Sequence, residues 1–168
     1  MPQHDVSPTE VLDWLMAGDP SVAYMTARDL LDEARPDLQA RIATEGWGAA
    51  LLGQRHEDGH WGRGFYFPKW TSTHYTLLDL ANLRCQPVPQ IAETVDAVLE
   101  EVNAGRPSGK SVYTDLCING MALNYASWFG AAEGKLAPFV DFLLDDIMPD
   151  GGFNCQRARL WGPPPPPR

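Results

Sequence analysis

Three cysteines, Cys85, Cys117 and Cys155, are among the side chains of this 168-residue chain that could act as nucleophiles or bind a metal. An odd number of cysteines at wide spacing does not suit a disulfide framework. We therefore expect free thiols, or one metal ligand among them.

Two segments that lead into predicted helices align in residue type. Residues 70–77 read Trp-Thr-Ser-Thr-His-Tyr-Thr-Leu, and residues 113–120 read Tyr-Thr-Asp-Leu-Cys-Ile-Asn-Gly. Both begin with an aromatic residue and a threonine, at an offset of 43 residues. His74 and Cys117 therefore occupy equivalent positions on successive helices.

Capping signals mark the first two helices. Ser7 and Glu10 predict a capping box, with Pro8 at the first helical position. Asp19 is predicted to cap a second helix that opens at Pro20. Residues 1–35 are thus predicted to be a helical lead-in.

Apolar residues at helical spacing predict further helices at 36–54, 72–84, 89–103, 114–128 and 135–147. Gly46 and Gly48 weaken the middle of the first of these. Because no segment alternates apolar and polar residues with period two, the predicted fold class is all-α.

The turns between the predicted helices repeat. Asp58-Gly59-His60-Trp61 follows one helix and Asp150-Gly151-Gly152-Phe153 follows another, at an offset of 92 residues. A third turn at 103–107 lies midway, which gives a period of about 46 residues, close to the helix-pair repeats of solenoids. Each repeat unit is then a helical hairpin.

Composition narrows the classes of partner. The formal net charge is −9 and the 13 basic residues are scattered, so a nucleic-acid backbone would be repelled. No stretch approaches the roughly 18 apolar residues that a membrane span needs, and the first residues do not form an export signal. We expect a cytoplasmic protein of one domain.

The repeated turns resemble those of the prenyltransferase and squalene-cyclase repeat family, in which Asp-Gly-x-Trp follows a helix that often ends near a glutamine, here Gln54. The resemblance covers residues 38–155 and implies an α/α toroid of inner and outer helices. It implies structural turn roles for Asp58, Gly59, Trp61, Asp150 and Gly151.

In protein prenyltransferases of this family, Asp-x-Cys and a histidine on different inner helices hold a catalytic zinc. The resemblance therefore implies zinc as cofactor, Asp115, Cys117 and His74 as its ligands, and Asp115 and Cys117 as catalytic residues. The order departs from the family, because the histidine here precedes Asp-x-Cys. Alternatively, Asp115 caps a helix, Cys117 packs in the interior and His74 is a neutral core histidine.

The inner helices of this family line a cavity that holds an isoprenoid chain. The matching positions here are Trp70, Tyr75, Tyr113 and Asn119, as candidate substrate-binding residues, although aromatic residues at such positions also serve as ordinary core. The Asp-x-Asp-Asp acid of terpene cyclases is absent, and the pair Asp145-Asp146 suits a solvated helix end. Enzymatic activity is therefore left open.

The repeat region, residues 36–155, holds about two and a half hairpins, against about six in a closed ring. We expect an incomplete ring that self-associates, followed by a proline-rich, disordered tail at 156–168 that suggests a truncated or frameshifted end. The primary expectation is an isoprenoid-binding protein of this family. The alternatives are a non-catalytic helical-repeat module that binds a ligand or protein, and an inactive fragment.

Overall fold

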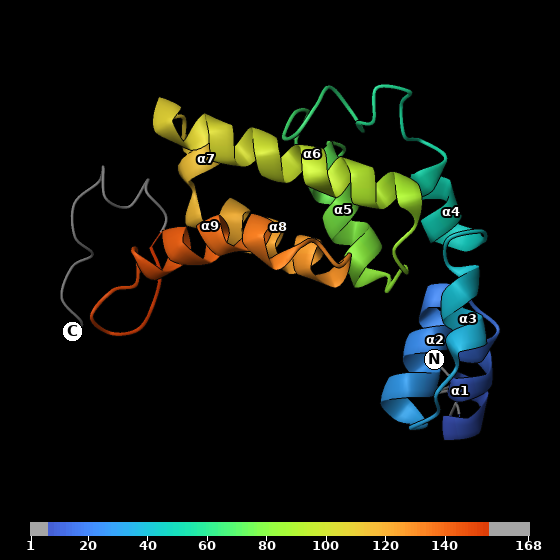
Figure 1. The fold of residues 1–168 in the computed structure, drawn as a ribbon. Helices are drawn as coiled ribbons and strands as arrows, with labels where there is room; N and C mark the ends of the chain where they lie inside the picture. The colour runs from blue at the N-terminus through green and yellow to red at the C-terminus, as the bar shows by residue number, and fades with distance from the viewer. Residues whose placement is uncertain (1–6, 155–168) are drawn as a thin grey trace, which may run out of the picture.

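The structure is a computed structural model and describes residues 7–154. Within this range it contains helices and no strand, which confirms the all-α prediction (Figure 1). The α-helices are α1 Pro8–Met16, α2 Pro20–Leu30, α3 Pro36–Arg41, α4 Gly46–Leu52, α5 Thr73–Asn82, α6 Pro89–Gly105, α7 Ser111–Thr114, α8 Leu116–Trp128 and α9 Glu133–Leu144, with a 3₁₀ turn, η1, at Arg106–Ser108. None of the described helices has the length and apolar character needed to cross a membrane.

The first two helices begin where their capping residues predict. The Ser7 Oγ accepts a hydrogen bond from the Glu10 backbone N–H at 3.2 Å, and the Ser7 N–H donates to the Glu10 carboxylate at 2.8 Å. One oxygen of Asp19 accepts from the Ser21 N–H at 2.9 Å and starts α2. The other oxygen of Asp19 accepts a hydrogen bond from the Trp47 N–H at 2.8 Å. Asp19 therefore also satisfies a backbone N–H group in the first turn of α4.

The single helix expected over residues 36–54 is two helices, α3 and α4. Gly46 breaks it, because its φ of 62° lies in the left-handed region, which favours glycine. A Cβ at Gly46 would also collide with the Asp19 carboxylate. The shorter helix α3 packs on α2, so that Leu38 shares a small apolar cluster with Ala23 and Ala27 of the lead-in.

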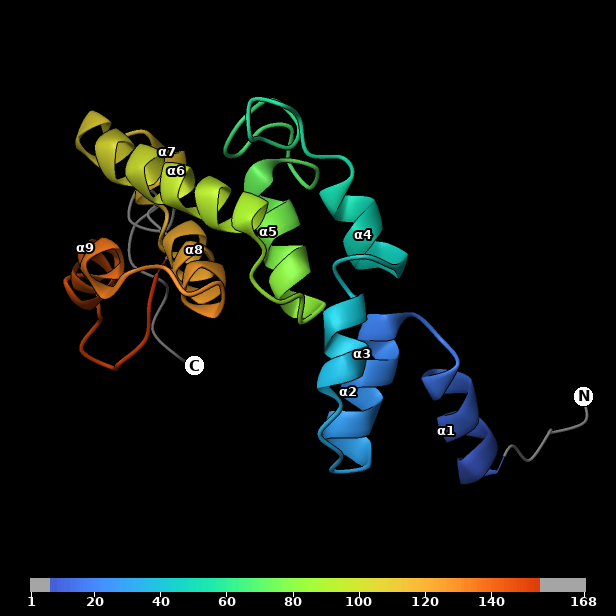
Figure 2. The same cartoon turned by 45° about the vertical axis from the view of Figure 1, so that its right-hand side comes forward.

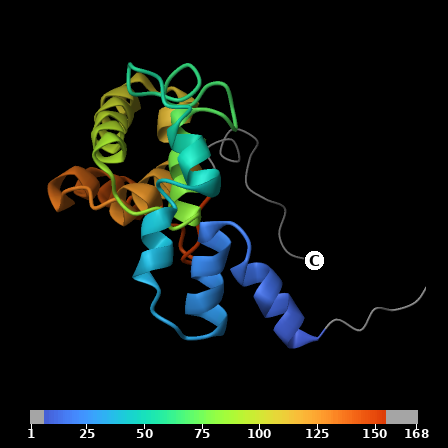
Figure 3. The same cartoon turned by 90° about the vertical axis from the view of Figure 1, so that its right-hand side faces the viewer.

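The main core lies among the later helices (Figures 1 and 2). Helix α5 packs on α8, and α6 packs on α9, while α6 also contacts α5 and α8. Their buried side chains form one apolar cluster that includes Leu77, Val98, Tyr125 and Phe139. Figure 3 shows α1, α2 and α3 together at one end of the molecule, joined to the main core through α4.

Candidate functional site

His74 lies at the centre of an aromatic cluster. The ring centroids of Phe65, Tyr66, Tyr75 and Tyr125 lie 5.2, 5.7, 5.1 and 5.6 Å from that of His74. The rings of Phe65, Tyr75 and Tyr125 meet the imidazole edge to face, the arrangement in which ring edges and faces attract. We call these five residues the His74 cage.

The loop before α5 builds part of this cage. The backbone N–H groups of Thr73 and His74 donate to the carbonyls of Gly64 and Phe65 at 3.3 and 2.9 Å. These bonds satisfy two of the N–H groups that the first turn of a helix leaves unpaired. They also hold the Phe65 and Tyr66 rings over the start of α5.

The His74 side chain is fully buried. Its Nδ1 lies 3.3 Å from the Tyr125 hydroxyl, and its Nε2 has no hydrogen-bond partner in the described part of the chain. Burial lowers the pKa of His74 to about 4, because a charged imidazole would lose its hydration without gaining a counter-ion. His74 is therefore neutral at pH 7.

The expected zinc ligands are not gathered into one site. Across residues 7–154, no three side chains of His, Cys, Asp or Glu lie close enough together to hold a metal ion. His74 faces Tyr125 inside the cage, whereas Cys117 is exposed. Asp115 occupies the N-cap position of α8, but its side chain makes no capping hydrogen bond.

Two of the candidate substrate-binding residues form an aromatic pair at the edge of the cage. Trp70 is 69% exposed, and its ring centroid lies 4.8 Å from that of Tyr75. The Tyr75 hydroxyl lies 3.1 Å from the Tyr66 hydroxyl, and burial together with this hydrogen bond raises the pKa of Tyr75. Tyr75 is thus a buried, neutral phenol that is in contact with an exposed indole.

Tyr113 connects the cage to α6. Its ring stacks on Phe65 at 6.1 Å, and its hydroxyl donates to the Glu101 carboxylate at 2.9 Å. Burial and this hydrogen bond raise the pKa of Tyr113. A Cβ at Gly105 would lie 2.6 Å from the Tyr113 ring, so glycine is required there for the close approach.

Asn119 is fully buried and uses its polar groups within the fold. Its Nδ2 donates to the carbonyls of Tyr113 and Asp115 at 3.2 and 3.0 Å, and its Oδ1 accepts from Arg106 at 2.8 Å. The Arg106 guanidinium also lies over the Phe139 ring at 4.2 Å. This network fixes the start of α8 to the end of α6 and to α9.

The two Asp-Gly turns have the same hydrogen bonds. In the first, the Gly59 N–H donates to the His56 carbonyl at 3.0 Å, and the His60 N–H donates to the Asp58 carboxylate at 3.1 Å. In the second turn, 92 residues later, the Gly151 N–H donates to the Met148 carbonyl at 2.8 Å, and the Gly152 N–H donates to the Asp150 carboxylate at 3.0 Å.

Both glycines of these turns have left-handed φ angles, 89° at Gly59 and 82° at Gly151. Trp61 is buried next to the first turn, and its indole N–H donates to the Leu51 carbonyl at 2.7 Å. Its backbone N–H donates to the Thr73 hydroxyl at 3.0 Å. Trp61 therefore links the turn to the end of α4 and the start of α5.

An accessible groove runs along the solvent-facing side of α8. Cys117, Gly120, Asn124 and Ser127 lie on this side at helical spacing. Two cavities open along it, of about 260 and 690 Å³, and both are lined by Gly120. A Cβ at Gly120 would meet nothing within 4 Å. We call the two cavities together the α8 groove.

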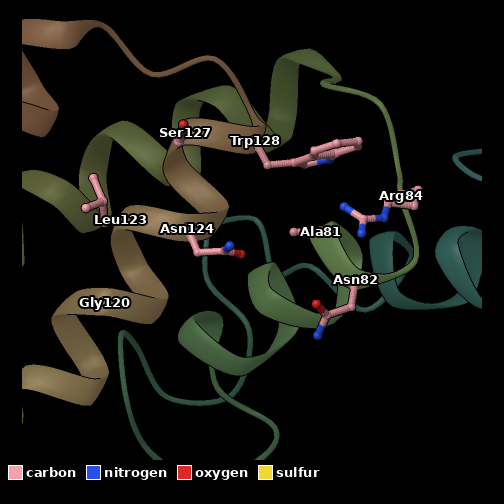
Figure 4. Close-up of a pocket in the computed structure, with 8 residues that line it drawn as sticks. All are labelled: Ala81, Asn82, Arg84, Gly120, Leu123, Asn124, Ser127 and Trp128. Atoms are coloured by element: carbon pink, nitrogen blue, oxygen red, sulfur yellow. The ribbon is translucent and has the colours of Figure 1, made fainter. Parts of the chain in front are cut away.

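The two ends of the α8 groove differ in chemistry. The smaller cavity is mostly apolar and is lined by Leu116, Cys117, Leu143 and Phe153. The larger cavity lies between the C-terminal ends of α5 and α8, and Figure 4 shows its polar side chains. These are Asn82, Arg84, Asn124 and Ser127, beside Trp128.

Arg84 and Trp128 close the polar end of the α8 groove. The Arg84 guanidinium carbon lies 5.2 Å from the Trp128 ring centroid, within the range of a cation–π contact (Figure 4). The Trp128 indole N–H donates to the Cys85 carbonyl at 2.8 Å, which fixes the ring. The Arg84 Nε is buried and has no hydrogen-bond partner in residues 7–154.

Reasoning from the sequence missed several of these residues. Phe65 and Tyr66 lie in an aromatic run between Gly64 and Pro68, which is a local signal for a folded loop. Tyr125 carries no such signal, because only the packing of α5 on α8 brings it to His74. Arg84 has a weak signal as a basic residue just after a helix.

No family model matches the sequence, and neither a curated protein nor a solved structure matches the chain. The candidate site therefore stands on its own geometry.

Proposed function

We propose that this chain forms part of an α/α-toroid of helical hairpins and binds an isoprenoid-like apolar chain in the α8 groove. The observation that carries the proposal is the open surface along α8, where Gly120 lines both an apolar cavity of about 260 Å³ and a larger one of about 690 Å³. Pockets of this size suit small-molecule ligands. No reaction is assigned to the groove.

The hairpin repeat is supported by the equivalent turns at Asp58 and Asp150 and by the packing of the helices. Helices α5 and α8 are neighbours, as inner helices of a toroid would be, and α6 and α9 are neighbours, as outer helices would be. The α8 groove then lies on the inner side. In this arrangement the inner face of the repeat is the natural place for a ligand.

An apolar chain is supported by the lining of the smaller cavity. The partly exposed Leu143 and the half-exposed Phe153 would gain from being covered, since each buried CH₂ contributes about 0.8 kcal/mol. Affinity should therefore rise from geraniol to farnesol to geranylgeraniol until the groove is full. A gain of at least about tenfold per isoprene unit corresponds to burial of roughly two of its carbons.

The test is a titration of the protein with farnesol, followed by tryptophan fluorescence, for wild type and two matched variants. Gly120→Leu fills the groove, whereas Gly134→Leu places the same side chain on α9, where a Cβ also meets nothing within 4 Å. Both changes remove a helical glycine, so neither should lower the melting temperature.

Gly120→Leu should weaken farnesol binding at least about tenfold, while Gly134→Leu binds as wild type does. Equal loss in both variants, or the absence of farnesol binding to the folded wild type, would refute the proposed function. Gly120→Ala adds one methyl group and should retain binding, which separates blocking of the groove from an effect on the helix.

A second candidate function is binding to another protein or a second copy. It is favoured by apolar side chains exposed on and just after α9, namely Val140, Leu144 and Ile147. Light scattering after size-exclusion chromatography tests this function. A concentration-dependent dimer that Leu144→Glu dissociates would support it, and a monomer at all concentrations would refute self-association.

A further inference from the structure

The end of α5 and the end of α8 have the same backbone structure. After α5, the Arg84 N–H donates to the Ala81 carbonyl and the Cys85 N–H donates to the Leu80 carbonyl, both at 3.0 Å. After α8, the Gly130 N–H donates to the Ser127 carbonyl at 3.1 Å and the Ala131 N–H donates to the Ala126 carbonyl at 3.0 Å. This pair of bonds defines the Schellman motif, which favours glycine at its left-handed position.

Arg84 therefore occupies the position that Gly130 occupies 46 residues later. The φ angles are 64° at Arg84 and 76° at Gly130, so both residues are left-handed. A residue with a Cβ is strained in this conformation, and such strain is often found where a side chain has a function. The structure of the helix end does not require the arginine.

The Arg84 side chain is fixed in place, and its buried Nε–H has no acceptor among residues 7–154. Trp128 supports the guanidinium on one side, and Gln39 donates to the Arg84 carbonyl at 3.1 Å. Arg106, another partly buried arginine, donates through its terminal nitrogens to Asn103, Asn119 and a backbone carbonyl. Within the described residues, the buried Nε–H groups of both arginines lack an acceptor, but of the two only Arg84 lines the larger cavity of the α8 groove.

The charges around Arg84 leave its guanidinium open to an added anion. Asp29 interacts electrostatically with Arg84, but its carboxylate is already held by Arg28 at 2.6 and 2.7 Å. The other polar residues of the cavity, Asn82, Asn124 and Ser127, are neutral. They can hydrogen-bond a ligand and carry no charge that would neutralise Arg84.

We propose that the ligand of the α8 groove is an amphiphile with an anionic head group, a carboxylate or a phosphate, and that Arg84 binds this head group beside Trp128. The planar guanidinium matches the oxygens of either anion in a bidentate pair. The apolar chain then extends past Gly120 towards Leu116 and Phe153. The position of the chain rests on the proposed function, whereas the anion site rests on Arg84.

The experiment compares farnesol, farnesoic acid and farnesyl phosphate, which share one chain, by calorimetric titration of wild type and Arg84→Gly. Glycine fits the left-handed position, so this variant should fold as wild type does, and thermal melting checks that it does. Asp32→Gly is the control, because Asp32 is also a left-handed residue after a helix, with φ 53°. Inorganic phosphate is titrated alone as a probe of the anion site.

At least one of the two anions should bind wild type about tenfold or more tightly than farnesol, and this preference should disappear in Arg84→Gly but not in Asp32→Gly. The anion that binds wild type with the higher affinity identifies the head group. Equal binding of all three ligands to wild type, or a preference that survives in Arg84→Gly, would overturn the inference.

The experiment distinguishes failure of the proposed binding of an apolar ligand from failure of the proposed anion site. If farnesol does not bind but phosphate binds wild type and not Arg84→Gly, the proposed function fails and the anion site stands. If farnesol binds and neither anion improves on it, the groove stands and the anion site fails.

Discussion

Acidification should destabilise this protein through His74. The folded imidazole has a pKa of about 4, against 6.5 for the ordinary side chain. As the pH falls below 6.5, the unfolded chain takes up a proton at this site and the folded chain does not, so the free energy of unfolding decreases. Linkage between these two values gives a loss of about 2 kcal/mol between pH 7.5 and pH 5. The loss reaches roughly 3 kcal/mol as the pH approaches 4 and then levels off for this group.

The assay is urea unfolding at pH 7.5 and pH 5 for wild type and His74→Gln. Glutamine retains a hydrogen-bonding group for Tyr125 but does not titrate, so the variant should lose about 2 kcal/mol less than wild type across this interval. Titration of the carboxyl groups and of the other histidines is common to both proteins and cancels in the comparison. The same pH dependence in both proteins would refute a buried, neutral His74.

Two further predictions concern stability. Trp61→Phe removes the indole hydrogen bond to the end of α4 and should cost about 1–2 kcal/mol in the free energy of unfolding, whereas Trp47→Phe, at a side chain that is 68% exposed, should change it by less than about 0.5 kcal/mol. Asn119→Ala leaves Arg106 and two carbonyls without their partner and should cost on the order of 3 kcal/mol, measured by the same urea assay with the exposed Asn82→Ala as control. A loss of less than about 1 kcal/mol in Asn119→Ala would contradict the role of this network.

Local signals predicted the helices well, because caps and turns depend on residues close in sequence. Ser7 and Asp19 cap their helices with side-chain oxygens at the predicted places. The expected helix at 72–84 is Thr73–Asn82, and the one at 89–103 is Pro89–Gly105. The break between α3 and α4 was harder to place, since it depends on Asp19, which lies far from Gly46 in sequence.

The candidate site was less predictable, because its surroundings are made by contacts distant in sequence. The sequence indicates that His74 and Cys117 are equivalent, and both are the second residue of their helices, α5 and α8. They nevertheless differ in burial, since His74 is buried and Cys117 is exposed. Aligned positions in the sequence predict the same backbone conformation, but they do not predict whether the side chain is buried or exposed.

The sequence offset between equivalent positions of α5 and α8 differs at the two ends of these helices. Their starts align at 43 residues, whereas their ends, Arg84 and Gly130, align at 46, because α8 is longer than α5. The cage closes over the start of α5, where Gly64 and Phe65 supply carbonyls to its first N–H groups. The side of α8 that carries the exposed Cys117, in contrast, borders two open cavities. A sealed aromatic core on α5 and an accessible groove on α8 thus lie on two helices that pack together, which is why the ligand proposal rests on α8 and Arg84 and not on the histidine.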